Sequence, residues 1–327
     1  MGWLWVATLA GCAGAHEGDV DLAGPPLSAA AFAQPLIELP LPPAESYGDL
    51  ASLRQVSSGY AAFYRKAIGQ GKESAGWEHR VFLSDDGVSW RLAGEPTTPT
   101  SVGYRTLAFG AGQYLLAGAN GGLSGALMVS NDAVRWSEVE TTLPAILKLE
   151  FLNGRFFALG QQSGVYTSAD GVHFTGAATQ ALQLSAIAYG HGAYVAVGSG
   201  PIELSRDGAS WDSVALDCAW ADACVTPPGG EPVQGYRASV VFGGERFYAG
   251  RFSSEDGAHW EEIADLARVP DTYVLGWLLK RNASELSAWQ DGAAAVLHTT
   301  VVTDNSEHLD CRSRRCLLLP NALLLVP

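Results

Sequence analysis

A serine, an aspartate and an aromatic residue recur together five times in this chain, at the spacing Ser-x-Asp-Gly-x-x-Trp or Phe. The copies are LSDDGVSW at 83–90, VSNDAVRW at 129–136, TSADGVHF at 167–174, LSRDGASW at 204–211 and SSEDGAHW at 253–260, with Ala133 replacing the glycine in the second. A hydroxyl close to a carboxylate could belong to an active-site loop. An active site would occur once, so five copies indicate a repeated structural unit.

The residue types explain what such a unit needs. Asp-Gly places a residue with positive φ at a hairpin tip at little cost, and the Ser and Asp side chains can bond the backbone of the turn. The aromatic ring then packs between neighbouring sheets, which stabilises by roughly 2–3 kcal/mol. The predicted structural residues are Ser84, Asp86, Gly87, Trp90, Ser130, Asp132, Trp136, Ser168, Asp170, Gly171, Phe174, Ser205, Asp207, Gly208, Trp211, Ser254, Asp256, Gly257 and Trp260.

A second repeated element precedes four of these turns. It reads FGAGQYLLAG at 109–118, FLNGRFFALG at 151–160, YGHGAYVAVG at 189–198 and FGGERFYAG at 242–250. Each copy is an aromatic residue, a tight glycine-containing turn and a strand of aromatic and β-branched residues. With the apolar stretch before it and the short strand after the Ser-Asp turn, one unit is a four-stranded hairpin sheet of about 40 residues.

These two elements resemble the Asp-box, or BNR, repeat of the sialidase-like β-propellers, over residues 81–265. The copies here lack the residue that usually separates Asp from Gly. The resemblance implies an all-β propeller of four-stranded antiparallel blades, in which ring closure removes exposed sheet edges. We expect six blades, with seven as the alternative, over residues 51–327. The last blade, from about 270, would be degenerate, and residues 36–43 could supply its closing strand.

The beginning of the chain predicts export. A short apolar run ends in Leu9-Ala10-Gly11-Cys12, which looks like the lipobox of bacterial lipoproteins. The resemblance implies a signal peptide at 1–11, lipid on Cys12 and an Ala- and Pro-rich tether over 12–50. We therefore expect an outer-membrane or surface lipoprotein of a bacterial cell envelope, or otherwise a secreted protein, that meets the membrane only through its lipid.

Four further cysteines, Cys218, Cys224, Cys311 and Cys316, predict disulfides in an exported protein. Three connectivities are possible, and the short separations favour Cys218–Cys224 and Cys311–Cys316. A zinc site would need all four, but they lack CxxC spacing, so we expect no metal and no cofactor.

Composition and net charge limit the classes of molecule that the protein is expected to bind. The chain has 327 residues, 47% of them hydrophobic, and a formal net charge of −14. This charge argues against binding to nucleic acid. We expect a monomer whose partner is a protein or a glycan. Two insertions, 66–79 and 217–234, are expected on the face opposite the Ser-Asp turns, and they make Trp77 and Trp220 candidate binding residues.

The catalytic chemistry of the sialidase-like family is not assignable from the sequence. The resemblance would require an arginine triad, but Arg54, Arg65, Arg105, Arg155, Arg237 and Arg246 are scattered and carry no shared motif. We therefore expect a non-catalytic binding or scaffold module. A sialidase-like glycoside hydrolase and an assembly factor for an envelope protein complex are the alternatives.

Overall fold

The computed structural model of the chain describes one short helix, α1 (Ala44–Tyr47), and 28 β-strands. The structure describes residues 42, 44–69, 76–97, 101–162, 164–214, 239–243, 245–249 and 252–263. At 37–38 and beyond 271 it describes the strands but not their side chains. Cys12, Cys218, Cys224, Trp220 and Arg237 lie outside the described residues.

The strands form seven four-stranded antiparallel sheets. The first three contain β2 (Asp49–Val56), β3 (Gly59–Ile68), β4 (Gly76–Ser84) and β5 (Arg91–Gly94), then β6 (Val102–Gly110), β7 (Gln113–Asn120), β8 (Gly125–Ser130) and β9 (Ser137–Val139), then β10 (Ile146–Leu152), β11 (Arg155–Gly160), β12 (Val165–Ser168) and β13 (Thr175–Ala177). The fourth and fifth contain β14 (Leu182–Gly190), β15 (Ala193–Ser199), β16 (Ile202–Ser205) and β17 (Asp212–Val214), then β18 (Val240–Gly243), β19 (Arg246–Ala249), β20 (Phe252–Ser254) and β21 (Glu261–Glu262). The sixth contains β22 (Thr272–Val274), β23 (Trp277–Asn282), β24 (Glu285–Gln290) and β25 (Ala293–Thr299), and the seventh joins β26 (Leu309–Arg312), β27 (Arg315–Leu318) and β28 (Ala322–Leu325) to β1 (Ile37–Glu38).

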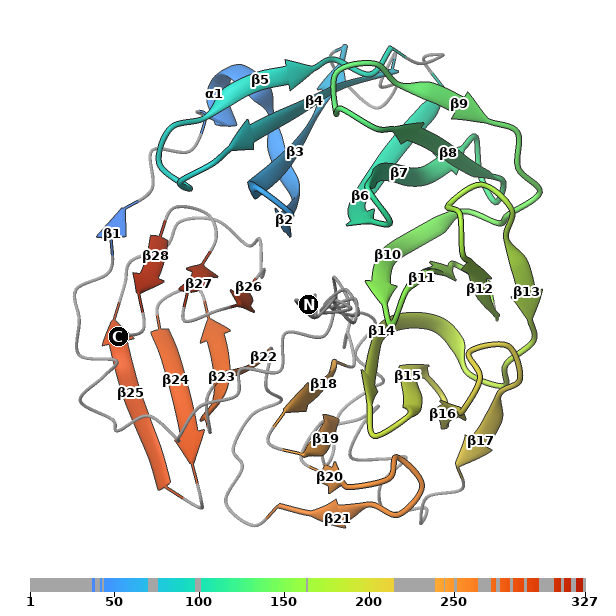
Figure 1. Cartoon of the computed structure of the whole chain (residues 1–327), viewed down its shortest axis with the longest axis vertical. Helices are drawn as coiled ribbons and strands as arrows, with labels where there is room; N and C mark the ends of the chain where they lie inside the picture. Colours follow the sequence, from blue (N-terminus) through green and yellow to red (C-terminus); the bar gives the residue numbers. More distant parts are fainter. Residues whose placement is uncertain are drawn as a thin grey trace, which may run out of the picture.

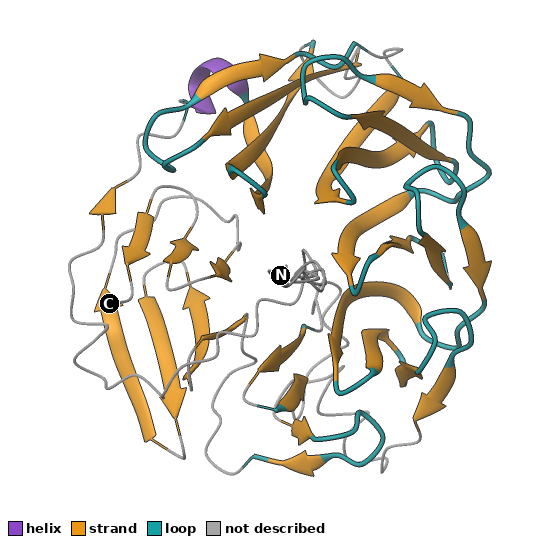
Figure 2. Ribbon diagram, in the orientation of Figure 1, coloured by secondary structure: helices purple, strands orange, loops and turns teal. Residues whose placement is uncertain are grey.

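The sheets stand around a ring, as a β-propeller requires (Figures 1 and 2). In each of the first six, the strand that comes first in sequence is innermost and pairs with the second, which pairs with the third and fourth in turn. The inner strands contact one another from β2 round to β26, and β26 contacts β2 again. Each sheet therefore contacts the next one, and the ring is closed.

Seven sheets is one more than the six expected, and equals the alternative. The reason is the length of the tail. Residues from 272 onward hold a full sheet and three strands of another, where a single degenerate sheet had been expected. The fourth strand of the seventh sheet comes from the other end of the chain, because Ile37 pairs with Leu323 and Glu38 with Ala322.

Two-residue turns join the first and second strands of the sheets. Ala111-Gly112, Asn153-Gly154 and His191-Gly192 each have positive φ at both residues, between 45° and 74°. This is the type I′ geometry whose twist matches that of paired strands. Asn, His and Gly adopt positive φ more readily than most residues, so the positions of these residues favour hairpin turns at these points of the chain.

The core lies between the sheets. One cluster joins Phe63 of the first sheet to Leu107 and Leu116 of the second, and another joins Leu115 of the second to Phe156 of the third. The second sheet therefore buries both of its faces against its neighbours, and the ends of the strands lie at the two faces of the ring. We call the face with the Ser-Asp turns the turn face, and the opposite face, with the connections at 121–124 and 200–201, the loop face.

Candidate binding surface

The Ser-Asp turns satisfy their own polar groups. In the turn at 84–90, the Ser84 hydroxyl accepts the Gly87 N–H at 2.8 Å, and Asp86 Oδ1 accepts the N–H groups of Val88 and Ser89 at 2.7 Å each. The same bonds recur in the turns at 168–174, 205–211 and 254–260. At 130–136, Ala133 adopts φ 59° in place of the glycine. These side chains serve the turn, which leaves little chemistry for a substrate.

These hydrogen bonds also keep the aspartates of the turns ionised. The backbone N–H groups of Ser89 and Val88 hold the pKa of Asp86 at about 2. The N–H groups of Ser210 and Ala209 do the same for Asp207, whose pKa is also about 2. A carboxyl held this low stays ionised at any pH where a general acid would work, so neither group can donate a proton to a substrate.

The aromatic rings of these turns enter the cores between sheets. Trp136 packs against the cluster of the first and second sheets, and Phe174 against that of the second and third. The indole N–H of Trp136 donates to the Ala133 carbonyl at 3.0 Å, and Trp90 and Trp260 make the equivalent bond. Trp211 Nε1 is buried and has no hydrogen-bond partner among the described residues.

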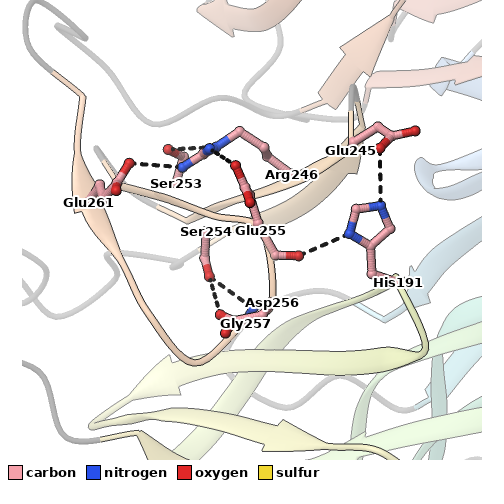
Figure 3. A network of polar contacts seen from close by, with 9 residues as sticks. All are labelled: His191, Glu245, Arg246, Ser253, Ser254, Glu255, Asp256, Gly257 and Glu261. Carbon is pink, nitrogen blue, oxygen red and sulfur yellow. Dashed lines mark hydrogen bonds and ion pairs between the residues drawn. The ribbon is translucent and has the colours of Figure 1, made fainter.

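Polar contacts tie neighbouring sheets together on the turn face (Figure 3). His191, in the first turn of the fourth sheet, points between two groups of the fifth: Nδ1 is 3.1 Å from the Glu255 carbonyl and Nε2 is 3.6 Å from a Glu245 carboxylate oxygen. Arg246 bonds Glu255 at 2.7 Å and Glu261 at 3.0 Å. The histidine thus bridges two sheets, and the arginine holds the hairpin that receives it.

At the centre of the ring, Arg54 bonds inner strands of two other sheets. Its Nε donates to the Leu107 carbonyl at 3.0 Å, and its Nη2 to the Leu149 carbonyl at 3.4 Å and to Glu150 at 3.2 Å. Inner strands are sheet edges, so their outward carbonyls have no strand partner within the sheet. Arg54 therefore acts as a bond between three sheets, and Lys148, 3.3 Å from Glu150, adds a second cation there.

The remaining arginines of the catalytic hypothesis have separate surroundings. Arg155 donates to the Asp207 carbonyl on the turn face, Arg65 lies over the Trp77 ring, and Arg105 is exposed on β6. Arg54 and Arg246 have the partners already named. Each of these described arginines therefore has partners or surroundings of its own.

The loop face exposes large apolar side chains at the ends of strands and in their connections. Three of the exposed large apolar side chains lie there: Ile68 at the end of β3, Leu123 in the turn between β7 and β8, and Leu182 at the start of β14, with exposed fractions of 39%, 57% and 56%. The other three among the described residues are Val88 and Val134 at the tips of the turn face and Leu92 on β5, directly after the first Ser-Asp turn. Single exposed apolar residues are ordinary, but the first three lie on the face that the Ser-Asp turns leave to the variable connections.

Trp77 is placed differently from the expectation. Residues 66–79 were expected to form a loop, but 66–68 and 76–79 continue β3 and β4 as a paired hairpin, and Trp77 is the cross-strand partner of Ala67. The insertion lengthens two strands because its flanks can pair. Trp77 is half-buried, and its indole reaches the next sheet, where a methyl added to Gly103 would lie 3.1 Å from Nε1.

His79, which the sequence did not single out, anchors this junction. It is 2% exposed, stacks on Phe63 with ring centroids 5.9 Å apart, and its Nε2 accepts the Tyr104 N–H of the second sheet at 3.2 Å. Its other ring nitrogen is buried without a hydrogen-bond partner among the described residues. Burial first, and the charge of Arg65 second, lower the pKa of His79 to about 4.

Two further properties of the described residues bear on the kind of site they can form. No group of three or more His, Cys, Asp or Glu side chains there could hold a metal ion, and no helix there is long and apolar enough to cross a membrane. Cys311 and Cys316 are direct cross-strand partners in β26 and β27. That pairing places their Cα atoms at a separation that a disulfide can span.

Comparison with known proteins identifies the fold. No family model matches the chain, and no curated protein matches it. Among solved structures, it is similar to YCF48 bound to a D1 peptide, with TM-score 0.55 and 14% identity over 89% of this chain and 94% of that one. It is also similar to Sqt1 of Saccharomyces cerevisiae, with TM-score 0.56 and 9% identity over 89% and 98%, and to the WD40 repeats of RRP9, with TM-score 0.54 and 9% identity over 82% and 86%. At these identities the likeness concerns the fold, and the chain is an all-β protein with the β-propeller fold.

Proposed function

We propose that this chain is a non-catalytic binding propeller that presents its loop face to a protein partner in a bacterial cell envelope, held to the membrane by lipid on Cys12. The observation that carries the proposal is the contrast between the two faces. The turn face uses its Ser and Asp side chains on its own backbone, while the loop face exposes Leu123, Leu182 and Ile68. Rigid scaffolds commonly bind through such variable connections.

The comparisons support a binding or scaffold role. One similar structure is a YCF48 complex with a peptide, and others are WD40 propellers. An assembly factor for an envelope complex is the narrower form of this proposal, in which the partner would be a precursor held temporarily. A sialidase-like hydrolase has less support, because the described arginines bond to separate sheets.

The test is chemical crosslinking and capture of the full-length protein from the envelope of the cells that make it. The loop-face variant carries Leu123→Asp and Leu182→Asp, and the matched control carries Val134→Asp on the turn face, where the valine is 50% exposed. We expect the wild type and the control to capture the same protein and the loop-face variant to lose it. Capture that survives in the loop-face variant, or that is lost only in the control, would contradict the proposal.

Membrane attachment is tested separately. Cys12→Ser removes the thiol that would carry the lipid, so we expect the protein to move from the membrane fraction to the soluble fraction. A variant that remains in the membrane fraction after a carbonate wash would show that another feature attaches it.

A further inference from the structure

The seventh sheet carries two arginines at the residues that close its first hairpin. Arg312 ends β26, Arg315 begins β27, and the two residues are direct cross-strand partners. Cross-strand partners belong to the same face of a sheet, and their Cβ atoms are about 4.5–5.5 Å apart. The register therefore brings two cationic residues to one position, which we call the arginine pair.

The arginine pair differs from the corresponding pair in the other six sheets. Each first hairpin has the same register, with two residues between the partners that close it. The six other pairs are Val56–Gly59, Gly110–Gln113, Leu152–Arg155, Gly190–Ala193, Gly243–Arg246 and Val274–Trp277. None of these has more than one cation, and no other cross-strand pair of the described strands joins two Lys or Arg residues. The fold itself therefore does not require a second cation at this position.

Two cations at such a position need an anion, because like charges directly opposite each other destabilise a sheet. Two described sheets show what the fold offers an arginine at the start of the second strand. Arg246 bonds Glu255 at 2.7 Å, in the Ser-Asp turn of its own sheet. Arg155 donates to the carbonyl of Asp207, in the Ser-Asp turn of the next sheet. In both cases the partner belongs to a Ser-Asp turn.

The seventh sheet has no Ser-Asp turn of its own to offer. Its third and fourth strands, β28 and β1, come from distant parts of the sequence, so no turn joins them. The next turn around the ring, at 84–90, uses the Asp86 carboxylate for its own N–H and hydroxyl groups. That turn leaves the carboxylate of Asp85, which is one negative charge for two arginines. The Ser-Asp turns therefore leave at least one of the two cations unmatched.

The cysteines of this hairpin favour a fixed spacing of the arginines. Cys311 and Cys316 are the next cross-strand pair, and the disulfide that the sequence predicts between them would keep the two strands from slipping in register. The strand β26 is the innermost of its sheet and contacts β22 on one side and β2 on the other (Figure 1). In a four-stranded antiparallel sheet the first and third connections lie at the same end, so the arginine pair lies on the turn face, beside the axis of the ring.

We propose that the arginine pair binds a dianionic phosphate group, either the free ion or a monoester on a larger molecule. A carboxylate matches the fork of one guanidinium group, whereas a phosphate dianion has oxygens enough to accept paired N–H bonds from two. The net charge of −14 gives an anion no long-range attraction to the chain, so the affinity comes from these short-range bonds. The site lies on the face opposite the proposed protein-binding surface and does not depend on it.

The measurement is isothermal titration calorimetry of the full-length protein with inorganic phosphate, at a pH of about 8, where phosphate groups are dianions. Glycerol 3-phosphate is the monoester and acetate is the carboxylate for comparison. We expect saturable binding of both phosphates and binding of acetate that is at least about tenfold weaker. Arg312→Gln and Arg315→Gln should each weaken phosphate binding about tenfold, because each removes one fork. The matched control is Arg281→Gln on β23 of the sixth sheet, where the cross-strand partner is Leu286, and it should bind as the wild type does.

Urea unfolding separates lost binding from lost structure. Without phosphate, neither variant of the arginine pair should be less stable than the wild type, because each removes a like-charge contact. With saturating phosphate, the wild type and the control should gain stability and the two variants should not. Lower stability of both variants without phosphate would show that the pair serves the fold instead of a ligand.

Three further results would overturn the inference. The first is no saturable binding of phosphate, which would mean that the chain neutralises the pair itself. The second is acetate binding as tight as phosphate binding, and the third is equal affinity for phosphate in the wild type and both variants. Binding of inorganic phosphate alone would assign the site to the free ion, and equal binding of glycerol 3-phosphate would assign it to monoesters; either result supports the inference.

Discussion

His79 should make the protein less stable as the pH falls from about 6.5 towards about 4. In the unfolded chain the imidazole has its ordinary pKa of 6.5, while burial and then Arg65 lower the pKa in the folded protein to about 4. Between these values the unfolded state binds more protons, so the free energy of unfolding decreases with decreasing pH. The geometry gives the same sign, because a protonated Nε2 would face the Tyr104 N–H as a second donor.

The magnitude follows from the two pKa values. Their difference, from 6.5 to about 4, corresponds to about 3 kcal/mol at 1.36 kcal/mol for each pH unit. Most of the fall lies above pH 5, so we expect the free energy of unfolding to drop by about 2 kcal/mol between pH 7 and pH 5. Because His79 is only 2% exposed, solvent screening should reduce this value little.

The assay is urea unfolding followed by tryptophan fluorescence at pH 7, 6 and 5, on the wild type and on His79→Gln. A glutamine amide oxygen can accept the Tyr104 N–H and does not titrate. The variant should be less stable at pH 7, since it loses the stacking on Phe63, but its stability should change less with pH. The difference between the two proteins should shrink by about 2 kcal/mol at pH 5.

The comparison removes the contributions of the other histidines. His173, His191 and His259 are exposed beside carboxylates, and they are present in both proteins. If wild type and variant lose the same free energy between pH 7 and pH 5, the buried, neutral histidine is not the cause and the reasoning about this junction is wrong.

The remaining predictions concern stability and use the same urea assay. Trp136→Phe should cost about 1 kcal/mol more than Trp211→Phe, because the Trp136 indole N–H is hydrogen-bonded and that of Trp211 is buried without a partner among the described residues; equal costs would contradict this. Gly257→Ala should cost about 1–3 kcal/mol more than Gly192→Ala, since both have positive φ, of 77° and 72°, but only at Gly257 would a methyl meet other atoms, the nearest at 2.7 Å; a smaller cost at Gly257 would refute the steric argument. Glu203→Leu should cost about 3 kcal/mol, because this fully buried carboxylate accepts two backbone N–H groups of the chain entering the fourth sheet, and Glu203→Gln should cost less.

Local chemistry allowed much of the fold to be predicted. The Ser-Asp turns and the glycine-containing turns mark where chains reverse, and strands of aromatic and β-branched residues must lie between them. Four-stranded sheets follow from that spacing. The tail beyond 271 carries no such turn, so its local sequence did not predict that its strands belong to two sheets. A closing strand from residues 36–43 was expected, and Ile37 does pair with Leu323. Which of the tail strands pair with one another depends on contacts between distant segments, which periodicity cannot reveal.

The candidate surface was less predictable, for a related reason. The expectation for residues 66–79 rested on their length and composition, while the pairing of Trp77 with Ala67 depends on register. His79 looked like one more polar residue, and only the position of the neighbouring sheet shows that it accepts the Tyr104 N–H.

As the pH falls, the junction between the first two sheets near the loop face should lose stability before the turns of the turn face do. The carboxyls of Asp86 and Asp207 have a pKa of about 2 in the folded protein, lowered by the backbone N–H groups of their turns. The stability that these bonds contribute is present above the ordinary carboxyl pKa of 3.8 and is lost only as the pH falls towards 2. In the folded protein His79 takes up its proton only near pH 4, but once the junction opens the imidazole binds a proton below about 6.5, so at pH 5 opening of the junction between the first two sheets costs less free energy while the hairpin turns are unaffected. Amide hydrogen exchange at pH 5, corrected for the intrinsic rate, should therefore speed up at Tyr104 and stay slow at Gly87, and the opposite order would show that the two faces do not titrate separately.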